Sequence, residues 1–327
     1  MNNYYPWQHE QWTQLHQRHQ SNGLPHALLF AGPDGIGKFD FARALSASLL
    51  CEQPNKEAQA CGSCKSCQLL NSDTHPDYSE VLPEEEGKAI KVDQIRELIE
   101  YLTLHAHYSG PRIVILSPAE QMNVAASNSL LKTLEEPRPG TLLILVSSQP
   151  AKLSATIRSR CQLLRFTAPD DKTALNWLAP QLEQADMAAP LLHLANGGPL
   201  LALSMAQNDA LNLQQQMQQD LAEIISGQSD PVSVASQWVK HPPSSYLNGL
   251  YLWVSDMIKQ RSGAIDEPDN AIAKGSLQSV AKTIDLKRLY AFMDKLIEAI
   301  RYQNSSANDR LTIEGLLILW ANMQPKQ

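Results

Sequence analysis

The stretch AGPDGIGKFDFARAL carries the residue spacing of a phosphate-binding loop. Four residues separate Gly32 from Gly37 and Lys38 follows, a pattern in which backbone N–H groups cradle phosphate and the lysine reaches it. Gly35 adds another residue that permits a tight turn. The next position normally supplies a hydroxyl to Mg²⁺, but here it is Phe39. The loop therefore has residues that can hold phosphate and lacks one that would hold the metal ion.

Four cysteines form the pattern C-x9-C-x2-C-x2-C, at Cys51, Cys61, Cys64 and Cys67. Two-residue gaps let thiolates converge on one ion, and four thiolates close a tetrahedral Zn²⁺ site that has no position for a reactive water. The surrounding segment is poor in apolar residues, so metal binding would supply its folding energy. We predict structural zinc. An iron–sulfur cluster, free thiols or a redox or zinc-dependent enzyme are the alternatives, although ferredoxins continue with a C-x3-C-P run that is missing here.

Two further residues of metal-binding types, His75 and Cys161, are interpreted as structural. Four thiolates already fill a zinc shell, so we expect a local loop role for His75. Cys161 begins a strand-like segment, and a buried packing position is expected for it.

The composition is typical of a soluble globular protein, with 43% apolar and 19% charged residues. A net charge of −7 argues against a broad electrostatic grip on DNA or an anionic membrane, although a local basic patch is compatible with it. The start of the chain has no secretory signal pattern, and the longest apolar runs are too short to span a bilayer. Clustered cysteines without such a signal indicate a reducing compartment, so we expect a cytoplasmic protein without membrane partners.

Short apolar runs alternate with longer amphipathic segments as far as Phe166. The patterns predict strands at 26–32, 77–83, 111–117, 141–148 and 161–166, and helices at 37–50, 92–106, 119–136 and 151–159. Such alternation is typical of a parallel sheet covered by helices on both faces. We therefore predict an α/β domain with the phosphate loop between its first strand and the following helix.

Only helical patterns follow Phe166, and they are interrupted at Gly197-Gly198-Pro199, Asp230-Pro231 and Pro242-Pro243. A loop is expected at 261–276. The predicted domains are an α/β domain at 1–166 with the zinc module at 51–67, a small helical domain at 167–207 and a larger helical domain at 208–327.

Several motifs occur in one order along nearly the whole chain. After the phosphate loop and the cysteines come THPDY (74–78), VDQIR (92–96), NSLLKTLEEP (128–137), IRSRC (157–161) and NDRLTIEGLL (308–317). This ordered set closely resembles the bacterial clamp-loader AAA+ proteins of DNA polymerase III. The resemblance implies an AAA+ module, a helical lid and a helical collar. It also implies a hetero-pentamer with ATPase subunits and a delta wrench subunit, which places the sliding clamp on primer-template DNA.

The same resemblance implies further nucleotide-binding positions, and this sequence departs from the family at each of them. Ser117 and Pro118 stand where the family has an Asp-Glu pair, and Leu200 stands where its lid motif has an arginine. Glu120 is not expected to replace the missing acids. Together with Phe39, these departures predict no ATP hydrolysis with Mg²⁺, which disfavours the alternative of an active AAA+ ATPase subunit. Weak phosphate binding and a simple tight turn both stay open for the loop.

By the same resemblance, Arg160 of the SRC motif projects into the nucleotide site of a neighbouring subunit. A guanidinium has permanent charge and five fixed donors, which suits the γ-phosphate. The bare sequence would favour a surface salt bridge instead, and Arg158 is either an orienting partner or solvated. We expect a non-hydrolysing subunit of the DNA-directed DNA polymerase holoenzyme that supplies an arginine finger in trans.

The NSLLKTLEEP helix has leucines at the spacing of a buried face. Lys132, Glu135 and Glu136 fall elsewhere on it, where a solvated face is expected. The resemblance places this helix near a subunit interface and a DNA-facing channel, which gives Lys132 a possible second role.

Overall fold

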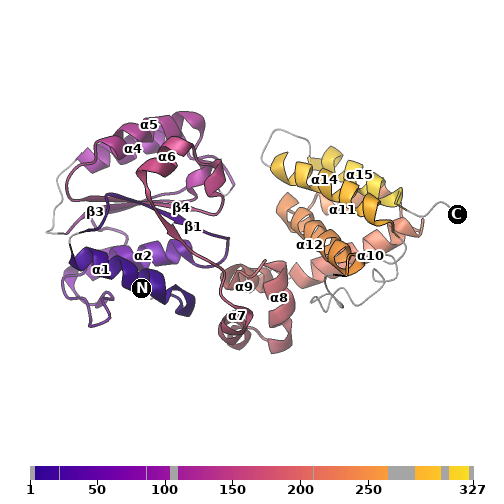
Figure 1. Ribbon diagram of the computed structural model, residues 1–327, viewed down its shortest axis with the longest axis horizontal. Coiled ribbons are helices and arrows are strands. Elements are labelled where there is room, and N and C mark those ends of the chain that lie inside the picture. The colour runs from indigo at the N-terminus through magenta and orange to yellow at the C-terminus, as the bar shows by residue number, and fades with distance from the viewer. Residues whose placement is uncertain are drawn as a thin grey trace. The chain divides into compact units, whose positions relative to one another are not determined.

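The computed structural model describes residues 4–21, 23–85, 87–103, 110–208, 210–263, 284–302 and 309–323. It divides into two compact units, Met1–Thr173 and Ala174–Gln327. Figure 1 shows helices and strands in the first unit and helices in the second. The finer division into three domains stays a prediction.

The first unit is built on a five-stranded sheet with the order β2-β3-β4-β1-β5. Its strands are β1 (Ala27–Ala31), β2 (Tyr78–Val81), β3 (Arg112–Leu116), β4 (Thr141–Ser147) and β5 (Gln162–Arg165). Every neighbouring pair is parallel. Strands β1 and β3 are buried throughout, as expected for a parallel sheet covered on both faces. The predicted α/β architecture is therefore confirmed.

Helices cover both faces of this sheet (Figure 1). One face carries α1 (His9–Gln20) and α2 (Lys38–Leu50), and the other carries α4 (Val92–Thr103), α5 (Val124–Glu135) and α6 (Ala155–Arg160). Because side chains alternate along a strand, Leu28 and Phe30 join the core beneath α2 while Ala27 and Leu29 join the core beneath α5. Two hydrophobic cores thus fix the sheet between its helices.

Polar caps divide two of the predicted helices. The segment predicted at 119–136 contains the short helix η2 (Ala119–Gln121) and then α5, because the Asn123 side chain accepts a hydrogen bond from the backbone of Ala126. In the same way Ser154 separates η3 (Pro150–Lys152) from α6. Each capping side chain marks the start of a new helix inside a segment that the apolar spacing alone predicts to be one continuous helix.

Helices α1 and α3 (Lys65–Asn71) are not predicted by the sequence pattern. Helix α1 is largely polar, yet it buries Trp12 and Leu15 against the sheet core. The Trp12 indole also donates a hydrogen bond to the Glu57 carbonyl, which ties α1 to the cysteine-containing segment. Tertiary contacts therefore stabilise a helix whose own periodicity is weak.

The described part of the second unit contains only helices. The first helix, α7 (Asp171–Leu178), begins three residues before the second unit does. The helices that follow are η4 (Ala179–Gln181), η5 (Ala185–Met187), α8 (Ala188–Leu194), α9 (Pro199–Gln207), α10 (Ala210–Ile225), α11 (Pro231–Trp238), α12 (Pro243–Arg261), α14 (Leu286–Tyr302) and α15 (Asp309–Ala321). The Asp230 side chain caps α11, and Pro199 and Pro243 are at the starts of α9 and α12, so all three predicted interruptions are helix starts.

Helices α7 to α9 share a small hydrophobic core, and α10 to α15 share a larger one. Most of the loop predicted at 261–276 lies outside the described residues. None of the described helices combines the length and apolar character that a bilayer crossing requires.

A buried ion pair joins β3 to the segment before β2. Arg112 and Asp77 are both almost fully buried, with 3.0 Å between guanidinium Nη2 and carboxylate Oδ1. Arg112 also donates to the Tyr101 carbonyl, and its guanidinium lies 4.5 Å from the centre of the Tyr101 ring. This network fixes edge strand β2 and helix α4 to the sheet.

His75 extends this network towards the cysteines. Its Nε2 lies 2.8 Å from the hydroxyl oxygen of Ser66 in α3, and its Nδ1 accepts a hydrogen bond from the backbone N–H of Asp77. Burial lowers the pKa of His75, so the neutral imidazole is favoured. The expected local loop role of His75 is confirmed.

Replacing Asp77 by asparagine should strongly destabilise the protein, because Arg112 would keep its charge in a buried position. Removing one partner of a buried pair costs about 3–5 kcal/mol of the free energy of unfolding. Asp93→Asn is the control, since Asp93 pairs with Arg96 on the exposed surface, where such pairs contribute about 0–1 kcal/mol. Urea denaturation measures the free energy of unfolding of both variants. Equal losses in the two would contradict the structural role of the buried Arg112–Asp77 pair.

Candidate functional site

The predicted phosphate loop joins β1 to α2 in a tight turn. Gly35 and Gly37 have φ angles of 71° and 79°, in the left-handed region that glycine adopts without strain. Gly32 lies so close to the backbone of Phe166 that an added Cβ would come within 2.1 Å of the Phe166 carbonyl oxygen. The glycines are therefore required by the turn itself, with or without a bound phosphate.

Lys38 is buried at the start of α2 and bonds to its own loop. Its ammonium donates to the Pro33 carbonyl at 2.5 Å and to the Ser148 hydroxyl at 3.3 Å, and that hydroxyl donates to Asp34. Burial lowers the pKa of Lys38, and the nearby carboxylates of Asp34 and Glu120 oppose this effect. The lysine that would reach a phosphate thus bonds to its own loop and to the turn after β4.

The segment before α1 also bonds to this loop. The fully buried amide of Gln8 donates to the carbonyls of Ile36 and Gly37 at 2.8 and 2.9 Å. The Trp7 indole donates to the same Ile36 carbonyl at 3.0 Å. No local pattern indicates these contacts, because Ile36 lies 28 positions after Gln8 along the chain.

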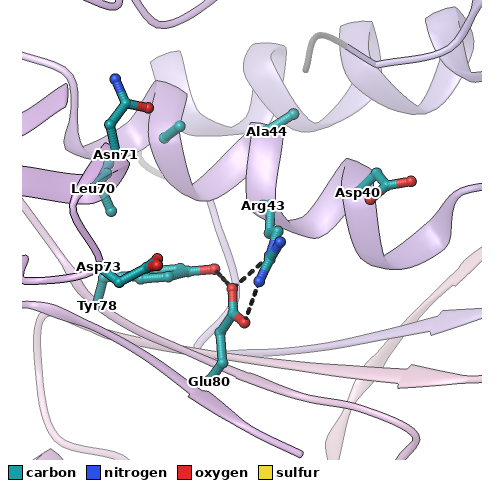
Figure 2. A pocket seen from close by; sticks show the side chains of 9 residues that line it. Asp40, Arg43, Ala44, Leu70, Asn71, Asp73, Tyr78 and Glu80 are labelled. Carbon is teal, nitrogen blue, oxygen red and sulfur yellow. Dashed lines mark hydrogen bonds and ion pairs between the residues drawn. The ribbon is translucent and has the colours of Figure 1, made fainter. Parts of the chain in front are cut away.

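Phe39 packs where a metal-binding hydroxyl would stand in an active loop. Its ring is partly buried against the sheet core, and the Arg43 guanidinium lies 4.7 Å from the ring centre. Arg43 donates two hydrogen bonds of 2.7 Å to Glu80, whose carboxylate also accepts from the Tyr78 hydroxyl. Figure 2 shows these three side chains converging from α2 and β2. They help to line a pocket of about 240 Å³.

The end of β3 is followed by Ser117 and Pro118, so it has no carboxylate at the two positions where the resemblance implies an Asp-Glu pair. Glu120 lies further along, and its Oε1 accepts hydrogen bonds from the backbone N–H groups of Ser148 and Gln149 at 2.9 and 3.1 Å. Glu120 therefore caps the turn after β4. Its Oε2 is buried and has no hydrogen-bond partner among the described residues.

The four cysteines predicted as ligands come together. The sulfur atoms of Cys51, Cys61, Cys64 and Cys67 all lie within 4.8 Å of one another, so this group can hold a metal ion. Backbone N–H groups of Cys61, Cys64 and Cys67 donate to three of the sulfurs. Four thiolates are the donor set of a closed structural zinc site.

The thiols of this group differ in acidity. Backbone N–H groups, with that of Ser63 contributing most, lower the pKa of Cys61 to about 6. Burial raises the pKa values of Cys51 and Cys67. A bound cation would favour the thiolate at every one of these positions. Cys161 stands apart, and burial raises its pKa to about 12, as expected for a packing residue.

Arg160 is the last residue of α6, and its side chain is about one-third exposed (31%). Its Nη2 lies 2.5 Å from Oε1 of Glu135 at the end of α5, and its Nη1 donates to the Thr156 carbonyl at 3.0 Å. The salt bridge that the bare sequence favours is therefore present. Glu135 was expected only on a solvated face, so its pairing with Arg160 is new.

Comparisons with known proteins point to the same family as the order of motifs along the chain. A family model described as "DNA polymerase III, delta subunit" matches residues 7–170, and one described as "DNA polymerase III, delta subunit, C terminal" matches residues 208–322. DNA polymerase III subunit delta′ of Pseudomonas aeruginosa is 35% identical over 327 residues, covering 98% of each chain. The Escherichia coli subunit delta′ is 33% identical, covering 96% of this chain and 94% of that one.

The chain belongs to the DNA polymerase III subunit delta′ family. This confirms the family relationship inferred from the motifs. Among solved structures, a gamma subunit-related protein of DNA polymerase III from Thermotoga maritima is 18% identical, with a TM-score of 0.46, and covers 95% of this chain and 99% of its own.

The cysteine group generates a metal-binding prediction. Protein purified with zinc under reducing conditions should hold one Zn²⁺ per chain, and Cys61→Ser should lose the metal and melt at a lower temperature because a ligand is removed. Cys161→Ser should keep the zinc, since Cys161 lies outside the group. Metal analysis with thermal denaturation tests this. Iron with visible absorbance, or full zinc retention by Cys61→Ser, would show the assignment to be wrong.

Proposed function

We propose that this delta′-family subunit acts in the DNA polymerase III clamp loader without hydrolysing ATP, and that Arg160 completes the ATP site of a neighbouring subunit. The observation that carries the proposal is a contrast within one unit. Side chains of the chain itself bond to the carbonyls of its own phosphate loop, while the Arg160 guanidinium is partly exposed at the end of α6.

The proposed absence of hydrolysis is supported by the residues that stand at the expected metal-binding positions. Phe39 and the Ser117-Pro118 pair provide neither the hydroxyl nor the carboxylates that would bind Mg²⁺. Metal stabilisation of the transferring phosphate is worth several kcal/mol, so its loss removes most of the chemistry. Lys38 and Gln8 bond to loop carbonyls, and a nucleotide would have to displace the lysine.

An arginine finger is supported by the chemistry and place of Arg160. A guanidinium keeps its charge at any working pH and can donate two parallel hydrogen bonds to phosphate oxygens. Since Arg160 ends a helix and is partly exposed, a partner's nucleotide can reach it without unfolding of the surrounding structure.

The partners in this proposal are those implied by the family. They are the ATPase subunits and the delta wrench subunit of a hetero-pentamer, together with the sliding clamp and primer-template DNA that the complex brings together. We assign residues 167–207 to the lid and residues 208–327 to the collar that joins the subunits.

The cysteine group is proposed to bind structural zinc in the cytoplasm. Four thiolates leave no open coordination position, so the ion would hold the segment 51–67 together without activating water. A reducing compartment keeps such thiols available to metal.

The isolated subunit should bind ATP weakly or not at all, with no effect of Mg²⁺ and no turnover. Phe39→Thr alone should not restore hydrolysis, because the carboxylates missing at Ser117 and Pro118 are still needed. Fluorescence titration with an ATP analogue, with and without Mg²⁺, and a phosphate-release assay measure this. Tight, Mg²⁺-dependent binding with turnover would instead support the active ATPase.

Replacing Arg160 by alanine in the reconstituted clamp loader should lower DNA-stimulated ATP hydrolysis and clamp loading. An arginine finger in trans contributes about 10³–10⁵ to the rate at the one site that it serves, so turnover at that site should be almost abolished. Arg165→Ala is the matched control, since Arg165 is exposed in the same unit. Unchanged hydrolysis and loading by the Arg160→Ala complex would refute the finger.

A further inference from the structure

The guanidinium of Arg160 is held in one orientation by its own chain. Nη2 bonds to Oε1 of Glu135, while Nη1 donates to the Thr156 carbonyl and, at 3.4 Å, to the Ser159 hydroxyl. Nε makes no hydrogen bond to any described residue. Because a guanidinium has five N–H donors, this arrangement leaves donors available for a phosphate.

Core packing puts Glu135 in reach of Arg160. Leu134 of α5 and Ile157 of α6 are buried in the same hydrophobic core, which brings the ends of the two helices together. Glu135 is the last residue of α5, and Arg160 is the last residue of α6. The distance between their charged groups is therefore set by elements that do not depend on the ion pair.

We propose that Glu135 is a positioning residue for Arg160, and this inference rests on the proposed arginine-finger function. A free arginine side chain samples many rotamers, and a neighbouring phosphate would have to immobilise it. The carboxylate fixes one edge of the guanidinium in advance, so less entropy is lost when the other donors engage phosphate. Both partners are partly exposed, so the pair contributes little to folding stability.

Glu136 provides a matched control. It is adjacent to Glu135, carries the same charge and is exposed, yet its carboxylate forms no ion pair with any described residue. A general loss of negative charge at this surface would affect Glu135→Ala and Glu136→Ala alike. A positioning role would affect Glu135→Ala alone.

The test is ATP hydrolysis by the reconstituted clamp loader on primed DNA. Glu135→Ala should lower kcat at the site that Arg160 serves by roughly 3- to 10-fold, as expected for one side chain that is no longer held in place. The KM for ATP should change little. Glu135→Gln should lie between wild type and Glu135→Ala, because its amide oxygen can still accept from Nη2 and its shape is unchanged.

Coupling between the two residues separates positioning from a structural effect. In the Arg160→Ala background, Glu135→Ala should cause no further loss, because no guanidinium remains to be positioned. Thermal melting of each subunit should show the Glu135 variants folded like Glu136→Ala.

The possible failures are distinguishable. If Arg160→Ala lowers the rate while Glu135→Ala matches Glu136→Ala, the positioning role is wrong and the arginine finger stands. Independent losses from Glu135→Ala and Arg160→Ala, or a rate increase in Glu135→Ala, would also overturn the positioning role. If Arg160→Ala itself changes nothing, the proposed function fails and this inference fails with it.

Discussion

The parallel pairing of β1 with both β4 and β5 is the interaction on which the phosphate-loop region depends. Residue Ala31, at the end of β1, is in register with Ser147 of β4 and with Arg165 of β5. Parallel strands end at the same edge of a sheet, so the loop after β1 meets the turn after β4 and the segment after β5. The approach of Gly32 to Phe166 and the bonds of Lys38 follow from this register.

The residues at and around the predicted phosphate loop are part of the structure that supports it. Phe39 adds its ring to the core and supports Arg43, whose ion pair with Glu80 joins α2 to the edge strand β2. Glu120 caps a turn, and Gln8 bonds to two loop carbonyls. These internal bonds help to hold the loop in its turn without a ligand. This explains how the frame can persist where the metal-binding residues are missing.

Most of the strands and helices of the first unit could be predicted because each has a local signal. Buried parallel strands such as β4 are continuous apolar runs, and α4 has apolar residues at helical spacing. The local pattern misses the point where a polar cap divides a predicted helix, as at Asn123. It also misses a polar helix that depends on distant contacts, as α1 does. The cysteine group was predictable in the same way, since two-residue gaps place neighbouring ligands close together.

The sequence by itself determined the parallel α/β unit, the group of cysteines that can hold a metal ion, the glycine turn and the family, because these depend on residue types at short or ordered spacings. Only the tertiary structure showed that Gln8 and Lys38 donate hydrogen bonds to loop carbonyls, that Glu120 caps the turn after β4 and that Glu135 pairs with Arg160. Most of these contacts join residues more than twenty positions apart. Packing of the sheet and its helices brings such residues together, and no local pattern records which polar side chains will then be within hydrogen-bonding distance.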